Sequence, residues 1–183
     1  MISAMRMIFI ALLLIPGLTW AKCPPSRDVS DQTAQLLTEL VNAKSEEAAT
    51  LAADGLWKIW HTAPDHTAQE LLDFAMARRE AYDFEMSENL LDELINYCPT
   101  YPEAFNQRAF SRFLRENYDG ALEDLDKVLE TTPYHFGALS GRALSLLRQG
   151  RIALGQKALR RAVRVHPFLR ERSMILEEYD DDI

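Results

Sequence analysis

Three prolines, Pro99, Pro133 and Pro167, recur at one constant interval, and Pro64 precedes the first of them by almost the same interval. Each ends a stretch rich in Leu, Ala, Glu and Arg, which are residues that lose little side-chain freedom in a helix. Proline lacks the backbone N–H that a helix interior needs, so each of these prolines fits just past a helix C-terminus. A fixed period of about 34 residues predicts stacked helical units.

Small and large side chains recur in the same register. Small residues let two helices approach closely, and large apolar residues fill the space between neighbouring units, so both are expected at fixed places in each unit. The small set is Ala75, Ala109 and Ala143 with Ser87, Ala121 and Gly155, and the large set is Leu71, Phe105 and Leu139 with Leu91, Leu125 and Leu159. Since one unit cannot bury its own apolar face, three or more must stack to form a core.

This pattern resembles the tetratricopeptide repeat (TPR) over three consecutive units. The units are 68–101, 102–135 and 136–169, and the middle one reads PEAFNQRAFSRFLRENYDGALEDLDKVLETTPYH. Arg78 and Arg112 depart from the family, which usually has an aromatic residue there. The resemblance implies an all-α fold, a right-handed α-solenoid of helix-turn-helix repeats.

The segments around the repeats are expected to cap the stack. We interpret 22–30 as a flexible segment, 31–66 as a divergent helical pair that forms an N-terminal cap, and 170–183 as a capping helix with an acidic tail. Trp57 and Trp60 are three residues apart and share a helix face. They are expected to pack against the next unit, the alternative being an aromatic contact site for a partner.

The segment 1–21 has the features of a secretory signal peptide. Arg6 precedes an apolar run, MIFIALLLIP, and Ala21 ends a stretch suited to cleavage. The run is about half of what a bilayer span needs, so no stable membrane insertion is expected after cleavage. We therefore expect an exported protein, located in a bacterial periplasm.

The net charge indicates which classes of partner the chain can bind, and the cysteines indicate which compartment it can occupy. The chain has 28 acidic and 20 basic residues, and loss of Arg6 with the signal peptide would make the net charge −9. Such a chain repels nucleic acid and anionic lipid. Cys23 and Cys98 can form a disulfide in an oxidising compartment, and two free thiols are the equal alternative.

The sequence contains no motif of a known catalytic, cofactor or metal site, so we expect no catalytic residue, no cofactor and no metal. The histidines are His61, His66, His135 and His166, and they lie at unit boundaries. Neither cysteine is in a C-x-x-C pair. An enzyme is therefore not expected.

The family resemblance places the first helix of each unit along a concave surface, where a partner protein or peptide would bind. Apolar residues there are not needed for the repeat to fold, and they indicate a binding groove. The expected groove residues are Leu72, Met76, Arg79, Asn106, Gln107, Phe110, Phe113, Leu144, Leu147 and Arg148. The alternative is a terminal cap that folds into the groove and covers it.

The sequence thus predicts a scaffold or adaptor that binds a helix or an extended apolar peptide in its concave groove. Some family members clamp a carboxylate with lysine and asparagine, but this chain has no lysine at the matching places. A second interpretation is a structural subunit of a cell-envelope complex, which would use the convex face, the tail or the Trp57/Trp60 face.

Overall fold

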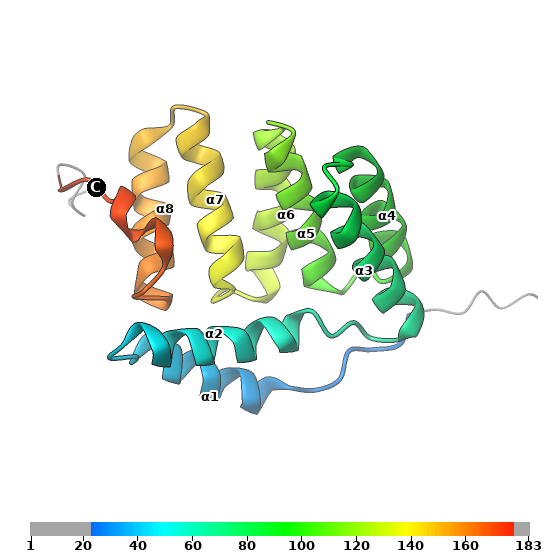
Figure 1. The fold of residues 1–183 in the computed structure, drawn as a ribbon, viewed down its shortest axis with the longest axis horizontal. Coiled ribbons are helices and arrows are strands. Elements are labelled where there is room, and N and C mark those ends of the chain that lie inside the picture. The colour runs from blue at the N-terminus through cyan, green and yellow to red at the C-terminus, as the bar shows by residue number, and fades with distance from the viewer. Residues whose placement is uncertain (1–22, 178–183) are drawn as a thin grey trace, which may run out of the picture.

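The computed structural model describes residues 23–177, and within that range it contains helices and no strand (Figure 1). The signal peptide predicted for 1–21 and most of the acidic tail lie outside the described residues. The helices are α1 (Ser30–Val41), α2 (Glu46–Trp60), α3 (His66–Glu80), α4 (Phe84–Tyr97), α5 (Pro102–Leu114), α6 (Tyr118–Thr131), α7 (Phe136–Arg148), α8 (Ile152–Val165) and the 3-10 helix η1 (Arg170–Met174). None of them is long and apolar enough to cross a membrane.

The turn inside each repeat is built in the same way. Tyr82, Glu116 and Gly150 occupy the same position in successive units, and each has a positive φ, of 63°, 62° and 74°. Each ends the first helix of its unit in the left-handed conformation, and the next residue donates its N–H back to a carbonyl of the last turn. The recurring turn gives the three helical hairpins the same shape.

The hairpins α3–α4, α5–α6 and α7–α8 stand side by side and form an α-solenoid (Figure 1). The small residues of the repeat are buried where the helices meet, as with Ala75, Ala109, Ala121 and Ala143. The all-helical solenoid predicted from the sequence is therefore confirmed.

Ion pairs explain why arginine replaces an aromatic residue in the middle unit. Arg112 Nε lies 2.9 Å from Glu88 Oε1 on α4, and its Nη1 lies 2.9 Å from Asp124 Oδ2 on α6. Arg108 donates to both oxygens of the same Asp124 and to Asp92 Oδ1 at 2.6 Å. These arginines join α4, α5 and α6 through charge-assisted hydrogen bonds.

The N-terminal helical pair does not cap the first unit, and this expectation was wrong. The α1–α2 hairpin runs across the lower ends of the upright helices (Figure 1) and shares an apolar core with α7 and α8, the last unit. Leu40 and Leu56 are fully buried in that core beside Leu159. The aromatic and alanine side chains of the hairpin pack against apolar residues of α7 and α8, in the last unit of the solenoid.

The segment predicted to be flexible, 22–30, has no helix or strand over residues 23–29, and it is held at both ends. Cys23 is bonded to Cys98 at the end of α4, with a Cα–Cα distance of 5.2 Å. Ser30 already begins α1. The chain is therefore held at the first unit by the disulfide before it crosses to the last unit.

The C-terminal cap is shorter than expected. η1 is a single 3-10 helix of five residues, and the chain after it is held by side chains of α8. Gln156 bonds to the carbonyl of Met174 and the N–H of Leu176, both at 2.9 Å, and Arg160 Nη2 bonds to the Leu176 carbonyl at 2.7 Å.

Candidate functional site

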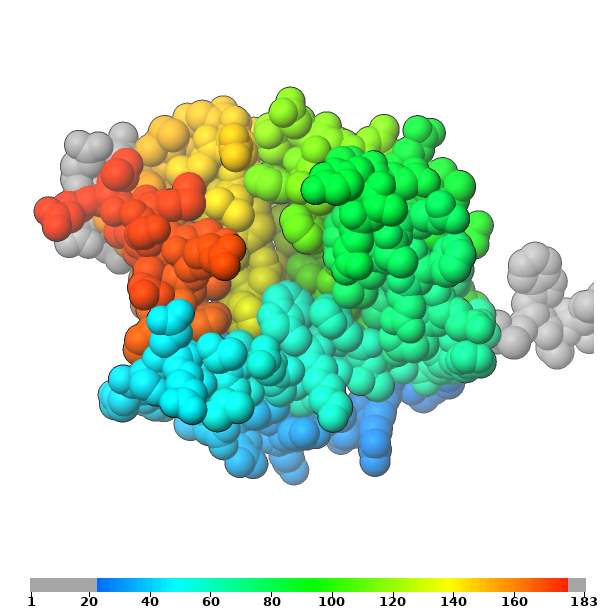
Figure 2. Space-filling model, viewed as in Figure 1, coloured from blue at the N-terminus to red at the C-terminus, as the bar shows by residue number. Residues whose placement is uncertain are grey.

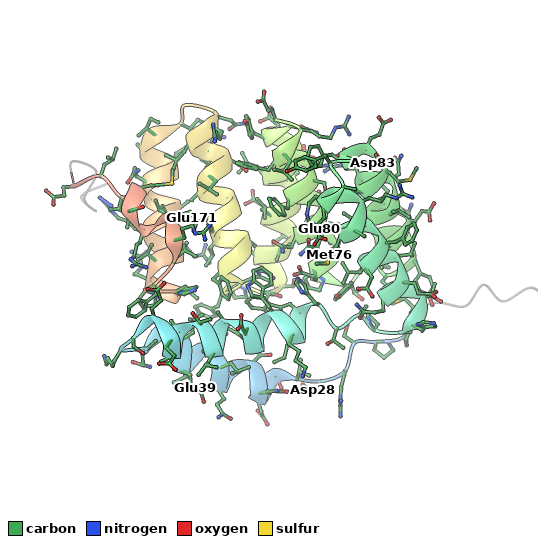
Figure 3. All side chains as sticks on the ribbon, viewed as in Figure 1. Asp28, Glu39, Met76, Glu80, Asp83 and Glu171 are labelled. Carbon is green, nitrogen blue, oxygen red and sulfur yellow. A yellow bond between two sulfur atoms is a disulfide. The ribbon has the colours of Figure 1, made fainter. Side chains whose placement is uncertain are left out.

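The concave side of the solenoid contains an apolar cavity of about 580 Å³. Figure 2 shows it as a hollow with α7 as its floor, α3 on one side, the C-terminal segment on the other and α2 below. Figure 3 places Met76 and Glu171 on opposite sides of it. The lining residues are Trp57, His61, Met76, Arg79, Asn106, Gln107, Ala109, Phe110, Phe113, Leu125, Phe136, Gly137, Ser140, Gly141, Leu144, Ser145, Leu169 and Glu171.

Most of the groove residues expected from the sequence line this cavity. They come from α3, α5 and α7, the first helices of the three units, so the fold brings them together from three different repeats. The set is Met76, Arg79, Asn106, Gln107, Phe110, Phe113 and Leu144.

Three expected groove residues lie elsewhere. Leu72 is fully buried in the core of the first unit, so its side chain is used to hold that unit together. Leu147 packs over Gly155 of α8, and Arg148 lies exposed at the end of α7.

Residues outside the first helices of the repeats complete the cavity, and the expected groove set did not include them. Trp57 and His61 come from α2 and its end, and Leu169 and Glu171 come from the C-terminal segment. No concave repeat position marks these four residues, because their place depends on how the terminal segments fold back. The N-terminal hairpin and the C-terminal segment thus border the cavity. The alternative interpretation expected a terminal cap to cover the groove, but these segments leave it open.

The apolar wall of the cavity carries one prominent ring. Phe110 is 48% exposed, and the guanidinium of Arg79 lies over it, 4.6 Å from the ring centroid. Arg79 also donates a short hydrogen bond to Gln107 Oε1. Burial lowers the pKa of Arg79 from its usual value, although the group stays a cation because an arginine pKa is so high. This wall of the cavity therefore combines an apolar surface with the positive charge of Arg79.

A buried carboxylate lies behind the polar end of the cavity. Glu103, near the start of α5, is almost fully buried and accepts hydrogen bonds from four side chains. His135 Nε2 is 2.9 Å from its Oε2, His61 Nε2 is 3.2 Å from its Oε1, and Asn106 and Gln107 donate to the same Oε1. The sequence places both histidines only at unit boundaries, and nothing in it brings them together because they are far apart in the chain.

The hydrogen bonds determine the charge of this carboxylate. Burial alone would raise the pKa of Glu103, but the hydrogen bonds from His135 and His61 outweigh it and lower the pKa to about 2. Glu103 is therefore an anion at neutral pH, held by donors from α2, α5 and the start of α7.

His135 has a structural task on each ring nitrogen. Its Nδ1 accepts the N–H of Ala138 at 3.1 Å and so caps α7, which leaves the proton on Nε2 for Glu103. Its ring stacks on Trp60 at 3.7 Å between centroids. Trp57 and Trp60 also pack against Phe136. They pack against the last unit, so the expectation of packing on the next unit was wrong, and Trp60 is too buried to form a partner face.

Within residues 23–177, no group of three or more His, Cys, Asp and Glu side chains is placed to hold a metal ion. The carboxylate of Glu103 accepts four hydrogen bonds, three at Oε1 and one at Oε2, and the cavity lining is mainly apolar.

Comparison with known sequences gives one informative relative and no matching family model. A TPR repeat-containing protein of Rhizobium etli is 32% identical over 133 residues, which is 73% of this chain. The match covers 65% of the relative, so the chain spans slightly less than two thirds of that protein.

Solved structures decide the fold. The first TPR domain of Spaghetti (RPAP3), bound to an HSP90 peptide, superposes with a TM-score of 0.58 over 62% of this chain and 90% of that domain, at 15% identity. The fold is a tetratricopeptide-repeat solenoid. MamA from Desulfovibrio magneticus RS-1 has a TM-score of 0.52 over 75% of each chain, at 16% identity. The TPR solenoid places the cavity on the concave side, lined by the first helix of each repeat.

Proposed function

We propose that this TPR protein is an exported interaction module that binds a peptide segment of a partner protein in its concave cavity. The supporting observation is the apolar wall across α5 and α7, in which Phe110 is 48% exposed and lies beside the half-buried Phe113 and Leu144. Peptide binding by a TPR domain of similar fold agrees with this proposal.

The chemistry of the cavity suggests the kind of segment that it binds. Apolar side chains would enter between Phe110 and Leu144, and a carboxylate or carbonyl oxygen would face Arg79, whose fork offers more donors than its one bond to Gln107 uses. Glu103 behind this end is a buried anion that accepts hydrogen bonds from Gln107 and His135, so a neutral carbonyl oxygen suits the place beside Arg79 better than a carboxylate.

The residues that border the cavity favour a short peptide segment as the ligand. Trp57 and His61 close the lower end, and Leu169 and Glu171 stand at the side, so a long helix along the whole groove would meet α2. An extended stretch of a few residues fits a cavity of about 580 Å³ better. The sequence predicted that either a helix or an extended peptide would bind, and the shape of the cavity favours the extended peptide.

The test uses a photo-reactive amino acid at position 110 in cells that express the full chain, with the same group at Leu51 as the control. Leu51 is 70% exposed on α2 and lies outside the cavity. We expect position 110, and not position 51, to capture a partner through one short segment. The segment is then synthesised and its affinity is measured by calorimetry.

The calorimetry compares matched variants. Phe110→Asp should weaken binding of that segment about 30-fold, since it removes a central aromatic contact, and Leu51→Asp should leave it unchanged. Phe113 is a poorer choice because it packs on Tyr118 inside the fold. Equal affinities of the wild type and Phe110→Asp would contradict the proposal.

The proposal includes export of the protein from the cytoplasm. The Cys23–Cys98 disulfide supports an oxidising compartment such as the periplasm, because cytosolic thiols are kept reduced. The acidic net charge argues against nucleic acid as a partner. Mass spectrometry of protein from fractionated cells should show a chain that begins at Lys22 outside the cytoplasm. An intact Met1 in the cytoplasmic fraction would contradict export.

A further inference from the structure

The repeats use one face of their first helix to contact the preceding unit. In the middle unit this face contains Arg108, Ser111, Arg112 and Arg115, which bind Asp92, Ser87 and Glu88 of α4. In the last unit Arg142 and Gln149 bind Asp126 and Asp119 of α6, each at 2.7 Å. The face is buried or paired in both units.

The same face of the first unit is uncovered. Subtracting the repeat period gives Phe74, Ala77, Arg78 and Ala81 on α3 and at its end. Glu70 lies one turn before Phe74 on the same side of the helix, and all five residues are exposed. Phe74 is 57% exposed, with the Arg78 guanidinium 5.4 Å from its ring centroid. We call these five residues the α3 face. It is bare because the α1–α2 hairpin lies against the last unit (Figure 1).

The order of charges on the α3 face is self-complementary. Glu70 lies four residues before Phe74 and Arg78 lies four residues after it, on one side of the helix. If a second α3 packs antiparallel with the two-fold axis at Phe74, each Glu70 meets the Arg78 of the other copy. Ala77 and Ala81 are small and allow the two helices to approach closely.

We propose that the α3 face is the interface of a two-fold symmetric dimer, whose occupant is a second copy of this chain. Phe74 packs on Phe74 of the other copy at the axis, and two Glu70–Arg78 pairs lie on either side. In the single chain these charges have only surface pairings on α3 and its turn, at 3.4 Å from Glu70 to His66 and 3.7 Å from Arg78 to Asp83. The cavity lies on another side of α3, so both sites can act together.

The test is sedimentation equilibrium of the full chain with its disulfide intact. We expect a mass of two chains for the wild type. Phe74→Glu should weaken the dimer about 30-fold, because it places a charge at the centre of the interface. Leu51→Glu, at an exposed residue outside the α3 face, should leave the dimer unchanged. Thermal melting checks that each variant is folded, as expected for changes at exposed positions.

A charge swap tests the antiparallel arrangement. Glu70→Arg and Arg78→Glu should each weaken the dimer by placing like charges together, and the double variant should bring the dissociation constant back to within about threefold of the wild type. A wild type that stays a single chain at high micromolar concentration would overturn the proposal, even if it binds another protein's helix there. A double variant no better than the single ones would overturn the two-fold geometry.

Discussion

The two ends of the solenoid are finished in different ways. At the last unit, α7 and α8 share their core with the α1–α2 hairpin, and the segment after η1 is bonded to Gln156 and Arg160 of α8. At the first unit, the disulfide fastens the lower end of α4, but the outer face of α3 is exposed.

This difference shows what a repeat pattern can and cannot specify. The repeat period determines how each unit packs on the next, because every unit offers the same faces. The ends of the stack have no neighbour, and only the segments outside the repeats decide how they are closed. Here both terminal segments stabilise the last unit, and the N-terminal one reaches it across the whole width of the solenoid (Figure 1).

Removal of the disulfide should have the largest effect on this arrangement. The bond closes a loop with a sequence separation of 75 residues, so a variant with Cys23→Ser and Cys98→Ser should lose about 4 kcal/mol of unfolding free energy in the chain-entropy model. Denaturant titration measures it, with reduced wild type as the matched sample. An unchanged unfolding free energy would mean that the Cys23–Cys98 disulfide does not stabilise the fold.

Acid should loosen the hairpin at its polar contact with α5 and α7. The pKa of Glu103 is about 2 in the folded protein and 4.5 in a model compound. A lowered folded pKa stabilises the protein above pH 4.5, and this stabilisation is lost as the pH falls from 4.5 towards 2, by roughly 3 kcal/mol in total.

Glu103→Gln supplies the control, because it has no such titration. Its deficit in unfolding free energy relative to the wild type should be present at pH 7 and should shrink between pH 4.5 and 2. Denaturant titrations at several pH values measure that deficit. A constant deficit over this range would show that Glu103 is not an anion held by His61 and His135.

A pair of glycines on α7 provides a smaller and more local test. A Cβ at Gly137 would lie 2.4 Å from Trp57 Cη2, and that ring is packed against Trp60, His135 and Phe136, so Gly137→Ala should cost about 2 kcal/mol. Gly141→Ala meets only Leu125, at 3.4 Å, and should be neutral or stabilising by up to about 1 kcal/mol. Thermal melts of the two variants measure the difference, and equal midpoints would contradict close packing of α2 on α7.

The repeat register allowed the solenoid and most of the cavity to be predicted from the sequence. Met76, Phe110 and Leu144 come from equivalent faces of consecutive first helices, so the period alone brings them together. The prediction for Leu72 was wrong because its side chain is buried in the core of its own unit, which the repeat position alone does not reveal.

The docking of the hairpin could not be predicted in this way. Trp57 and Trp60 interact with His135 and Phe136, which lie far along the chain at the start of α7 and carry no periodic signal that refers to α2. The apolar face of α2 would fit either end of the stack in a pattern argument. The choice is made by specific partners: the stacking of Trp60 on His135, the room at Gly137 and the buried carboxylate of Glu103.

Hydrogen exchange in Trp60→Ala tests most directly whether the hairpin belongs to the last unit. Trp60 packs on His135 and Phe136, so its loss should speed amide exchange in α7 and α8 and leave α3 and α4 near their wild-type rates. Faster exchange confined to α3 and α4, with α7 and α8 unaffected, would show that the hairpin caps the first unit and would contradict the structure described above.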